Sequence, residues 1–425
     1  MHNTDIADLI AAEERRQREG LELIPSENYV SRPVLEAMGS VFTNKYSEGY
    51  PGKRYYGGQT YTDKVEQLAI DRAKQLFGAD HANVQPHAGA PANIASYAAW
   101  AEPGDTIMGM DLGHGGHLTH GHPVTLAAKI WRFVRYGMKD IETGEIDYEQ
   151  LRETALREKP KIILAGFSAY PRELDYAKMA AIGEEVGAVM MADMAHIAGL
   201  IAGGVLANPF DHGFHVVLST THKTLRGPRG GLIMSKGTVS NPLKKPEKII
   251  ENLPTLIDRT VFPGFQGGPL MNMIAAKAVA FGEAQQPEFQ IYAEQVVKNA
   301  KQLAAELIKR GFKLITGGTD NHLILADIHT SFGIHGGEAE AVIDRIGLTL
   351  NKNAIPDDTL PPFRPSGIRL GTPAITTRGL REEHMEQLAE WMLGAIKNRN
   401  NEAVLERLSD EVKEFALQFP LPSDI

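Results

Sequence analysis

One lysine stands after an apolar run, in surroundings that suit a nucleophile. Residues 215–218 read as a strand, and Lys223 follows within residues 219–231, which are mostly small, polar or glycine. This segment offers few apolar neighbours, so the amine of Lys223 is more useful as a nucleophile toward a carbonyl. Such an amine forms a Schiff base, and a Schiff base at the end of a buried strand suggests pyridoxal phosphate.

An aspartate and an arginine could bind other parts of the same ligands. Asp193 follows an apolar run, where a carboxylate is costly to bury unless it meets a cation or hydrogen-bond donors. A protonated pyridine nitrogen would supply the cation, although Asp193 could instead cap the next helix. Arg369 stands between strand-like residues, where its guanidinium suits a carboxylate or forms a surface ion pair.

Two glycine-containing segments are candidates for a phosphate site. Residues 87–93 are small and precede a helix-like run at 92–100, so backbone amides there could hold an anion. Residues 266–269 contain two adjacent glycines before a helix expected near Met271. Either segment could also be a plain turn.

Two further loops are rich in histidine or tyrosine. Residues 113–122 hold four histidines, which could ligate zinc, but no acidic residue is interleaved after Asp111. The glycines there favour a loop around a flat ligand, so the sequence predicts no metal site. Residues 44–58 hold four tyrosines, and Glu48 could move protons. That loop could also form an aromatic interface, or do both by reaching a partner subunit's site.

The expected strands would bring these residues together. Apolar runs at residues 161–167, 188–194 and 215–221 read as buried strands, with a helix at 177–186 between the first two. This βαβ rhythm predicts a parallel sheet, and ligands bind beyond the carboxyl ends of such strands. The strand ends therefore predict a site that contains Asp193 and Lys223.

The remaining pattern predicts further helices and a second domain. Helices are expected at residues 5–20 and 63–77, the second with a capping box of Asp63 and Glu66. Residues 238–260 read as a surface excursion. Beyond about residue 285 we expect a smaller α+β domain. Its expected elements are a helix at 291–310, strands at 313–316 and 322–328, and a last helix at 383–397.

Bulk composition narrows the class of protein. With 425 residues, two domains are expected, and a net charge of -9 argues against a nucleic-acid binder. The chain has no cysteine, which excludes disulfides and thiolate metal sites. It shows neither a signal peptide nor an apolar run of the ~18 residues that a membrane span needs. A cytoplasmic location without membrane attachment is expected.

Together these segments resemble the serine hydroxymethyltransferase family of fold-type-I pyridoxal-phosphate enzymes. The similarity runs from residues 23–29 to 369–373, and its most specific blocks are residues 50–58, 114–121, 193–196 and 221–231. The resemblance implies an α/β fold with an N-terminal helical arm (residues 1–45), a large domain (46–285) and a smaller C-terminal α+β domain (286–425). A mostly parallel central sheet would form the large domain.

The resemblance also implies how a cofactor would be held. Lys223 would bind pyridoxal phosphate covalently, with His222 beside it shaping reaction specificity. Asp193 would pair with the pyridine nitrogen, His196 would lie near the phenolic oxygen, and His117 would stack on the ring. The remaining implied cofactor contacts are Gly89 and Ala90, with the amides of Gly267 and Gly268, at the phosphate, and Ser168 in the pocket wall.

Substrate and partner contacts follow from the same resemblance. Arg369, helped by Ser26, would clamp the substrate carboxylate, and Glu48 and Tyr56 would transfer protons. Tyr46, Glu48 and Tyr56 would reach a neighbouring subunit's site, which implies an obligate homodimer or a dimer of such dimers. The implied tetrahydrofolate contacts are Leu112, Gly116, His117 and Leu118, and in a second region Pro361, Pro362 and Phe363.

The implied reaction is the reversible conversion of serine and tetrahydrofolate to glycine and 5,10-methylenetetrahydrofolate. Two alternatives use the same scaffold: an α-methylserine hydroxymethyltransferase and a folate-independent β-hydroxy-amino-acid aldolase. A non-catalytic binding protein is a third, against which the complete set of Lys223, Asp193 and Arg369 argues.

The sequence departs from the family in the phosphate loop. It reads Ala88-Gly89-Ala90, where the family often has Ser-Gly-Ser or Ser-Gly-Ala. A lost hydroxyl removes a hydrogen bond to a charged group, worth about 1.5–3 kcal/mol. We therefore expect weaker retention of the cofactor, with activity preserved by the backbone amides.

Overall fold

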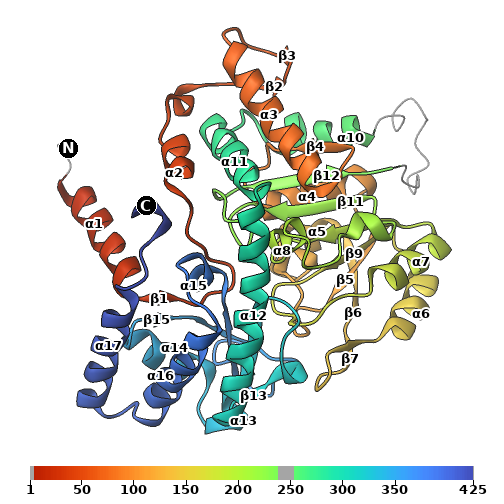
Figure 1. Ribbon diagram of the computed structural model, residues 1–425. Helices are drawn as coiled ribbons and strands as arrows, with labels where there is room; N and C mark the ends of the chain where they lie inside the picture. Colours follow the sequence, from red (N-terminus) through yellow and green to blue (C-terminus); the bar gives the residue numbers. More distant parts are fainter. Residues whose placement is uncertain (1–3, 238–252, 425) are drawn as a thin grey trace. The chain divides into compact units, whose positions relative to one another are not determined.

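The computed structural model describes residues 4–237 and 253–424 (Figure 1). The chain divides into two compact units, which are treated separately below. The central unit is Val30–Ala293, and the terminal unit combines Met1–Tyr29 with Glu294–Ile425. This grouping does not test which parts fold as domains, so the expected division at residues 45 and 285 stays a prediction.

The central unit is built on a seven-stranded sheet with the order β4-β12-β11-β10-β9-β5-β6. Neighbouring strands from β6 to β11 are parallel, and β12 is antiparallel to both β11 and β4. The α/β architecture with a mostly parallel sheet is therefore confirmed. In spatial order the strands are His81–Asn83, Gly231–Ser235, Val216–Thr220, Val189–Asp193, Ile162–Gly166, Thr106–Met110 and Arg132–Tyr136.

The three predicted strands are confirmed as β9, β10 and β11 (Figure 1). They form because their apolar residues are covered on both faces, as a parallel sheet requires. Every residue of β9 and β11 is buried, and so are the first four of β10. The predicted helix between the first two is α7 (Tyr176–Val186), which packs beside α6 (Tyr148–Glu158). Because β10 and β11 are parallel neighbours, their carboxyl ends lie at the same end of the sheet.

The helix start predicted at residue 63 is wrong. Helix α3 covers Thr60–Phe77 and begins three residues before the expected position, with no side-chain cap at Gln59. Asp63 and Glu66 do not form a capping box, because both carboxylates bind the guanidinium of Arg54. The predicted end at Gly78 is confirmed, since this residue adopts the left-handed conformation that glycine tolerates.

The terminal unit contains a four-stranded antiparallel sheet with the order β13-β14-β17-β16. Its strands are Lys313–Leu314, Leu323–Asp327, Gly367–Gly371 and Asn351–Asn353. The strand expected at 313–316 is shorter than predicted, because Thr316 takes a left-handed conformation within a 3-10 turn. A parallel pair, β1 (Leu21–Glu22) with β15 (Leu348–Thr349), joins the N-terminal segment to this unit.

Helices of the terminal unit cover its core. The expected helices are present as α1 (Thr4–Glu19), α12 (Pro287–Lys309) and α16 (Met385–Lys397). Helix α12 begins four residues earlier than expected and belongs to this unit from Glu294 onward. Helix α17 (Glu402–Ala416) was not predicted, although its buried residues recur at helical spacing and Asn401 caps it. Helix α14 (Gly336–Arg345) packs against α16, and α16 packs against α17.

The other helices complete the central unit. They are α2 (Arg32–Met38), α4 (Gly89–Trp100), α5 (Leu126–Ile130), α8 (Ala198–Ala202), α10 (Leu253–Arg259) and α11 (Met271–Ala284). Of the predicted surface excursion, residues 238–252 lie outside the described residues. No helix within 4–237 and 253–424 has the length and apolar character of a membrane span.

Candidate functional site

Two of the predicted residues lie at the same edge of the central sheet. Asp193 is the last residue of β10 and is the register partner of Leu218 in β11. Lys223 follows the end of β11 by three residues and is buried, with 9% of its surface exposed. The parallel pairing of β10 and β11 thus brings a carboxylate and an amine to one end of the sheet.

The carboxylate of Asp193 is held by three donors. Its Oδ2 accepts hydrogen bonds from Asn93 Nδ2 at 2.9 Å and His120 Nε2 at 3.1 Å, and its Oδ1 accepts from the backbone amide of Ala195 at 3.0 Å. Asp193 does not cap the next helix, α8, which begins at Ala198 without a side-chain cap. Its Oδ1 makes a local turn contact, while Oδ2 is oriented by distant residues. Asn93 and His120 are functional candidates that the sequence reasoning missed.

These donors decide the charge of Asp193. Burial by itself would raise the pKa of this carboxyl, but the hydrogen bond and charge of His120, the charge of His117 and the hydrogen bond from Asn93 outweigh it. The pKa of Asp193 therefore lies below its ordinary value. The carboxylate stays ionised at neutral pH and can hold a proton on a neighbouring basic nitrogen.

His117 is linked to this carboxylate through Thr119. Its Nδ1 lies 2.7 Å from Thr119 Oγ1, which also accepts a hydrogen bond of 2.7 Å from Asn93. Ligand atoms of His117, His120 and Asp193 lie within 4.8 Å of one another, as a metal site would need. Because hydrogen bonds already orient all three side chains, we retain the prediction of no metal.

The lysine segment carries a neutral imidazole. Burial first, and then the charges of Arg229 and Lys223, lower the pKa of His222 to about 3. Its Nδ1 is buried, and no hydrogen-bond partner for it lies within the described part of the chain. His222 therefore stays neutral beside Lys223 and can accept a hydrogen bond there, which suits its expected role.

His196 and Ser168 lie on the segments that follow β10 and β9. His196 is 2% exposed, and its carbonyl accepts a hydrogen bond of 2.9 Å from Thr224 Oγ1, next to Lys223. The amide of Ser168 donates to the carbonyl of Gly115 at 2.7 Å. The first bond links the segments that follow β10 and β11, and the second links the segment after β9 to the histidine loop.

The two glycine segments lie side by side. The side chain of Gln266 accepts from the amide of His87 at 3.0 Å and donates to the carbonyl of Gln85 at 3.1 Å. Gly89 is the first residue of α4, and a Cβ atom there would lie 2.8 Å from Cγ2 of Thr220. Amides in the first turn of a helix have no intrahelical partner and suit an anion.

The tyrosine loop adjoins these glycines. The hydroxyl of Tyr46 donates to Glu48 Oε1 at 3.2 Å, and the rings of Tyr46 and Tyr56 meet edge to face at 5.4 Å. A Cβ atom at Gly267 would lie 3.5 Å from Glu48 Oε1, and one at Gly268 would lie 3.4 Å from the Tyr46 ring. The expected proton-transfer residues therefore lie beside the second expected phosphate segment.

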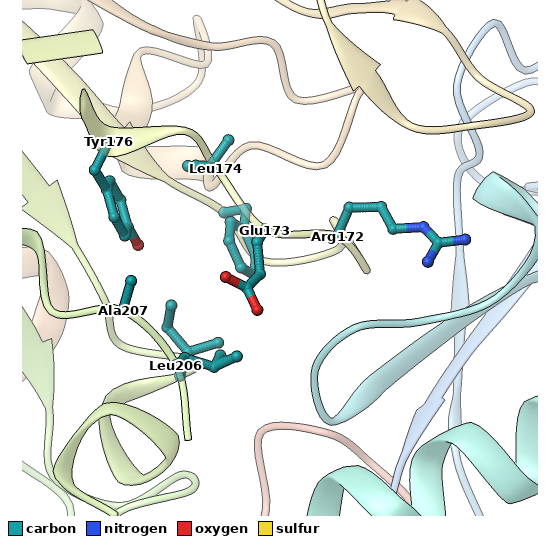
Figure 2. A pocket seen from close by; sticks show the side chains of 8 residues that line it. Arg172, Glu173, Leu174, Tyr176, Leu206 and Ala207 are labelled. Carbon is teal, nitrogen blue, oxygen red and sulfur yellow. The ribbon is translucent and has the colours of Figure 1, made fainter. Parts of the chain in front are cut away.

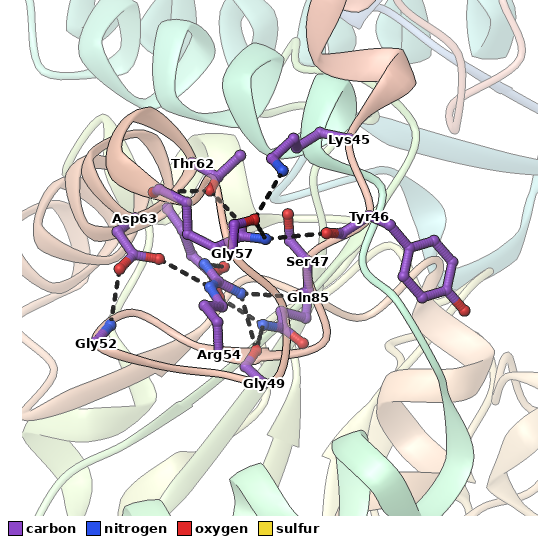
Figure 3. Close-up of polar contacts among 12 residues, drawn as sticks. Lys45, Tyr46, Ser47, Gly49, Gly52, Arg54, Gly57, Thr62, Asp63 and Gln85 are labelled. Carbon is purple, nitrogen blue, oxygen red and sulfur yellow. Dashed lines mark hydrogen bonds and ion pairs between the residues drawn. The ribbon is translucent and has the colours of Figure 1, made fainter.

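A buried polar network holds this loop in place (Figure 3). Arg54 Nη1 donates to the carbonyls of Ser47 at 2.8 Å and Gly49 at 2.9 Å, on either side of Glu48. Arg54 also binds Glu66 at 2.5 Å and Asp63 at 2.8 Å. Figure 3 shows the ring of Tyr46 pointing away from this network, so the loop is anchored on one side and presents the ring on the other.

Two residues of the expected folate-contacting stretch, Leu112 and His117, line a cavity of about 380 Å³ in the central unit, whereas Gly116 and Leu118 do not. Leu112, His117, His120 and Arg135 are among its lining residues, and its size suits a small organic ligand. Leu118 is 46% exposed. A Cβ atom at Gly116 would lie 2.2 Å from the carbonyl oxygen of Met110, so glycine is required there.

A second hollow, near the segment after β9, is much smaller (Figure 2). Leu174, Tyr176, Leu206 and Ala207 line it, with Glu173 at its side. Its volume of about 10 Å³ has room for little more than one water molecule. It is therefore too small to be a substrate site.

In the terminal unit, Arg369 lies within β17 and is only partly exposed. Its Nε donates to Oδ1 of Asn351 in the neighbouring strand at 3.2 Å. Burial lowers the pKa of Arg369 to about 10, which leaves it charged at neutral pH. The amide of Gly371 donates to the carbonyl of Leu23 at 2.7 Å, which attaches the segment before Ser26 to the same strand.

The second expected folate region is also in the terminal unit. Phe363 is 76% exposed, and the carbonyl of Pro361 accepts from the amide of Arg364 at 2.8 Å in a tight turn. Pro362 lies within that turn. An exposed aromatic side chain held on a defined turn is available for a ligand.

The donor set suits pyridoxal phosphate. An ionised Asp193 matches a pyridinium nitrogen, a buried Lys223 matches an aldehyde, and the amides at Gly89 match a phosphate group. Each of these groups lies in the central unit.

Comparison with known proteins gives a consistent result. The family model described as serine hydroxymethyltransferase matches residues 1–392. A serine hydroxymethyltransferase of Acidobacterium capsulatum is 56% identical over 418 residues, covering 98% of this chain and 94% of the relative. One of Koribacter versatilis is 54% identical over 416 residues, with the same coverage of both chains.

Proposed function

The chain belongs to the serine hydroxymethyltransferase family, and we propose that it moves the hydroxymethyl carbon of serine to tetrahydrofolate, leaving glycine. The family is one of fold-type-I pyridoxal-phosphate enzymes, with tetrahydrofolate as co-substrate. The observation that carries our assignment of residues is the buried Lys223 beside the ionised Asp193, at the ends of two paired parallel strands.

When bound, pyridoxal phosphate supplies an electrophilic carbon and a ring that accepts the electron pair of the breaking Cα–Cβ bond. Lys223 supplies the amine that holds this cofactor. Asp193 keeps a proton on the ring nitrogen, because Asn93 and His120 hold its carboxylate ionised and oriented. His117, linked to the same network through Thr119, would stack on the ring, and His196 would lie near its phenolic oxygen.

The amides at Gly89 and Ala90, together with those of Gly267 and Gly268, bind the phosphate. These two segments are already joined through Gln266, which supports a shared role. Backbone amides bind an anion without a cationic side chain, and the first turn of α4 adds a favourable dipole. Ser168 forms part of the pocket wall, and His222 influences which reaction follows.

Substrate positioning falls to Arg369 and Ser26, and proton movement to Glu48 and Tyr56. Arg369 is charged at neutral pH and presents a guanidinium fork to the serine carboxylate, with Ser26 assisting. Holding the carboxylate fixes which bond of serine can break, an orientation effect that can reach about 7–11 kcal/mol. Glu48 takes or returns the proton of the serine hydroxyl, with Tyr56 nearby.

Leu112, Gly116 and Leu118 form one face for tetrahydrofolate, and the exposed Phe363, with Pro361 and Pro362, forms another. The cavity of about 380 Å³ that Leu112 lines supports the first. The exposed side chain of Phe363 supports the second.

We further propose a homodimer in the cytoplasm, with a dimer of dimers as the alternative. Large side chains are exposed along and near the tyrosine loop, at Val41, Tyr46, Tyr55, Tyr56 and Tyr61. A cluster of exposed aromatic residues is typical of an interface rather than a free surface. A chain without cysteine also needs no oxidising compartment.

Spectroscopy and turnover test the function together. The purified protein, given pyridoxal phosphate, should show visible absorbance, and borohydride should fix the cofactor to the peptide that contains Lys223, as seen by mass spectrometry. Serine consumption should depend on tetrahydrofolate. The matched control is Lys223→Arg, which keeps the charge but should lose the covalent link and turnover.

Each contrary outcome has its own meaning. Cleavage of serine at the same rate without tetrahydrofolate would overturn the transferase assignment in favour of the folate-independent aldolase. A preference for α-methylserine would point to the sibling transferase. Failure to bind pyridoxal phosphate would overturn the assignment of the site.

A further inference from the structure

A second buried lysine contacts segments that adjoin the proposed cofactor site. Lys277, on α11, is 2% exposed, and its ammonium donates to three backbone carbonyls. The distances from Nζ are 2.7 Å to Val84, 3.1 Å to Pro86 and 2.8 Å to Gly231. The steps proposed above give this residue no role.

Burying a lysine without a paired carboxylate is unfavourable. Burial lowers the pKa of Lys277 to about 7, and the charge of Glu66 acts in the opposite direction. Within the described parts of the chain, Lys277 forms no ion pair. Three carbonyl acceptors use all three protons of the ammonium, whereas a neutral amine has only two to give, so the contacts favour the charged form.

The three carbonyls adjoin two segments of the proposed site, the phosphate loop and the segment that contains Lys223. Val84 and Pro86 precede the phosphate loop, and Gly231 follows the lysine segment as the first residue of β12. The amide of Gly231 donates to Pro86 at 2.9 Å, and a Cβ atom at Gly231 would lie 2.4 Å from the carbonyl oxygen of Ala88. Lys277 therefore binds at the point where these segments cross.

The contact continues toward Lys223. A Cβ atom at Gly230 would lie 2.3 Å from Cε of Lys277 and 3.2 Å from Oγ1 of Thr221. The amide of Thr221 donates to the carbonyl of Gly230 at 3.1 Å, and Thr221 is two residues before Lys223. A shift of the Lys277 ammonium would thus disturb the lysine segment and the phosphate loop together.

We propose that Lys277 is a positioning residue that fixes the phosphate loop at Gly89 and Ala90 relative to Lys223. The ammonium holds the carbonyls of both segments in one frame, so that one ligand can meet the loop with its phosphate and Lys223 with its aldehyde. Its charge, which has no carboxylate partner, also favours a dianionic group nearby. This proposal rests on the proposed use of pyridoxal phosphate.

Comparing the affinities for pyridoxal phosphate and for pyridoxal tests this role, because general destabilisation would not affect the phosphate-containing ligand alone. Lys277→Met keeps most of the length of the side chain and removes its donors. We expect the dissociation constant of pyridoxal phosphate to rise about ten- to hundredfold, as for loss of charged hydrogen bonds. Pyridoxal, which has the same ring and aldehyde but no phosphate, should weaken by less than about threefold.

Two further variants keep this test decisive. Val34→Ala is the matched control, because Val34 packs with Ala276 and Ala280 of the same helix α11 without touching the carbonyls. It should lower thermal stability while changing either dissociation constant by less than about twofold. Lys277→Gln retains two N–H donors without charge and should fall between Lys277→Met and the wild type; it carries the test if Lys277→Met does not fold.

Equal weakening of pyridoxal phosphate and pyridoxal in the Lys277 variants would overturn the positioning role, and so would an unchanged affinity for pyridoxal phosphate. If the wild-type protein binds no pyridoxal phosphate, the proposed function itself fails. The two failures are therefore distinguishable.

Discussion

Removing the guanidinium of Arg54 should destabilise the protein strongly. Its side chain is 3% exposed, and it pairs with Glu66, which is fully buried, and with Asp63. In Arg54→Met the Glu66 carboxylate loses its cation inside the protein. Breaking one side of a buried ion pair costs about 3–5 kcal/mol, so we expect a loss of unfolding free energy in that range.

The pH dependence of this loss follows from Glu66. Burial raises the pKa of Glu66 in the folded protein, and the charge and hydrogen bond of Arg54 act against that rise. Without Arg54 the folded-state pKa should climb further above the unfolded value. A raised carboxyl pKa stabilises below the unfolded pKa and loses that stability as pH rises through the folded value. Arg54→Met should therefore be less destabilised at pH 5 than at pH 8.

Chemical denaturation followed by circular dichroism measures this loss. The double variant Arg54→Met, Glu66→Gln should recover part of the stability, because a neutral amide needs no cation and can still bond to Gln85. Arg152→Met is the control, since the Arg152–Glu185 pair is largely exposed and should contribute no more than about 1 kcal/mol.

Two results would refute this reasoning. One is an Arg54→Met loss as small as that of Arg152→Met. The other is a double variant as unstable as the sum of its single changes, because that would show no coupling between Arg54 and Glu66.

Three further predictions concern other residues. Asn93→Ala removes donors to Asp193 and should weaken pyridoxal-phosphate binding about tenfold in an absorbance titration, as loss of a charged hydrogen bond implies; unchanged binding would contradict it. Ala88→Ser should tighten binding by about 1.5–3 kcal/mol in equilibrium dialysis, and equal affinity would show that the missing hydroxyl is irrelevant. Burial and the charge of Glu27 raise the pKa of Glu22 to about 8, so wild-type stability should fall by at most about 1.4 kcal/mol per pH unit as pH rises from about 4.5 to 8. Glu22→Gln should remove that slope in thermal denaturation, and a persistent slope would assign it to another group.

The strands were predictable because burial on both faces leaves a simple pattern. The apolar runs that became β9, β10 and β11 differ from the observed strands by about one residue at each end. The capping box of Asp63 and Glu66 failed because a capping pattern depends on local spacing, whereas a buried arginine from another segment competes for the same carboxylates.

The candidate site also contains residues that could be predicted from the sequence and residues that could not. The residue types and strand-end positions of Asp193 and Lys223 were informative without a structure. The roles of Asn93 and His120 could not be predicted, because nothing in the helix around Asn93 or in the histidine loop indicates which distant carboxylate they bind. Lys277 did leave a signal, as the single charged residue in the first eleven of α11, although an isolated lysine does not reveal its acceptors.

Many of the contacts that could not be predicted from the sequence run from one cationic side chain to several distant backbone carbonyls. Arg54 binds the carbonyls of Ser47 and Gly49, and Lys277 binds three carbonyls around the phosphate loop. In the terminal unit Arg378, 5% exposed, donates to five carbonyls near the C-terminal ends of α1 and α17.

The physical reason is common to the three cations. Loops and helix ends carry carbonyls without regular partners, and burying such groups unpaired costs more than a single hydrogen bond returns. A long cationic side chain satisfies several at once and fixes the segments that carry them. Its position is set by where segments meet, not by the period of its own helix or strand, so hydrophobic periodicity cannot reveal it.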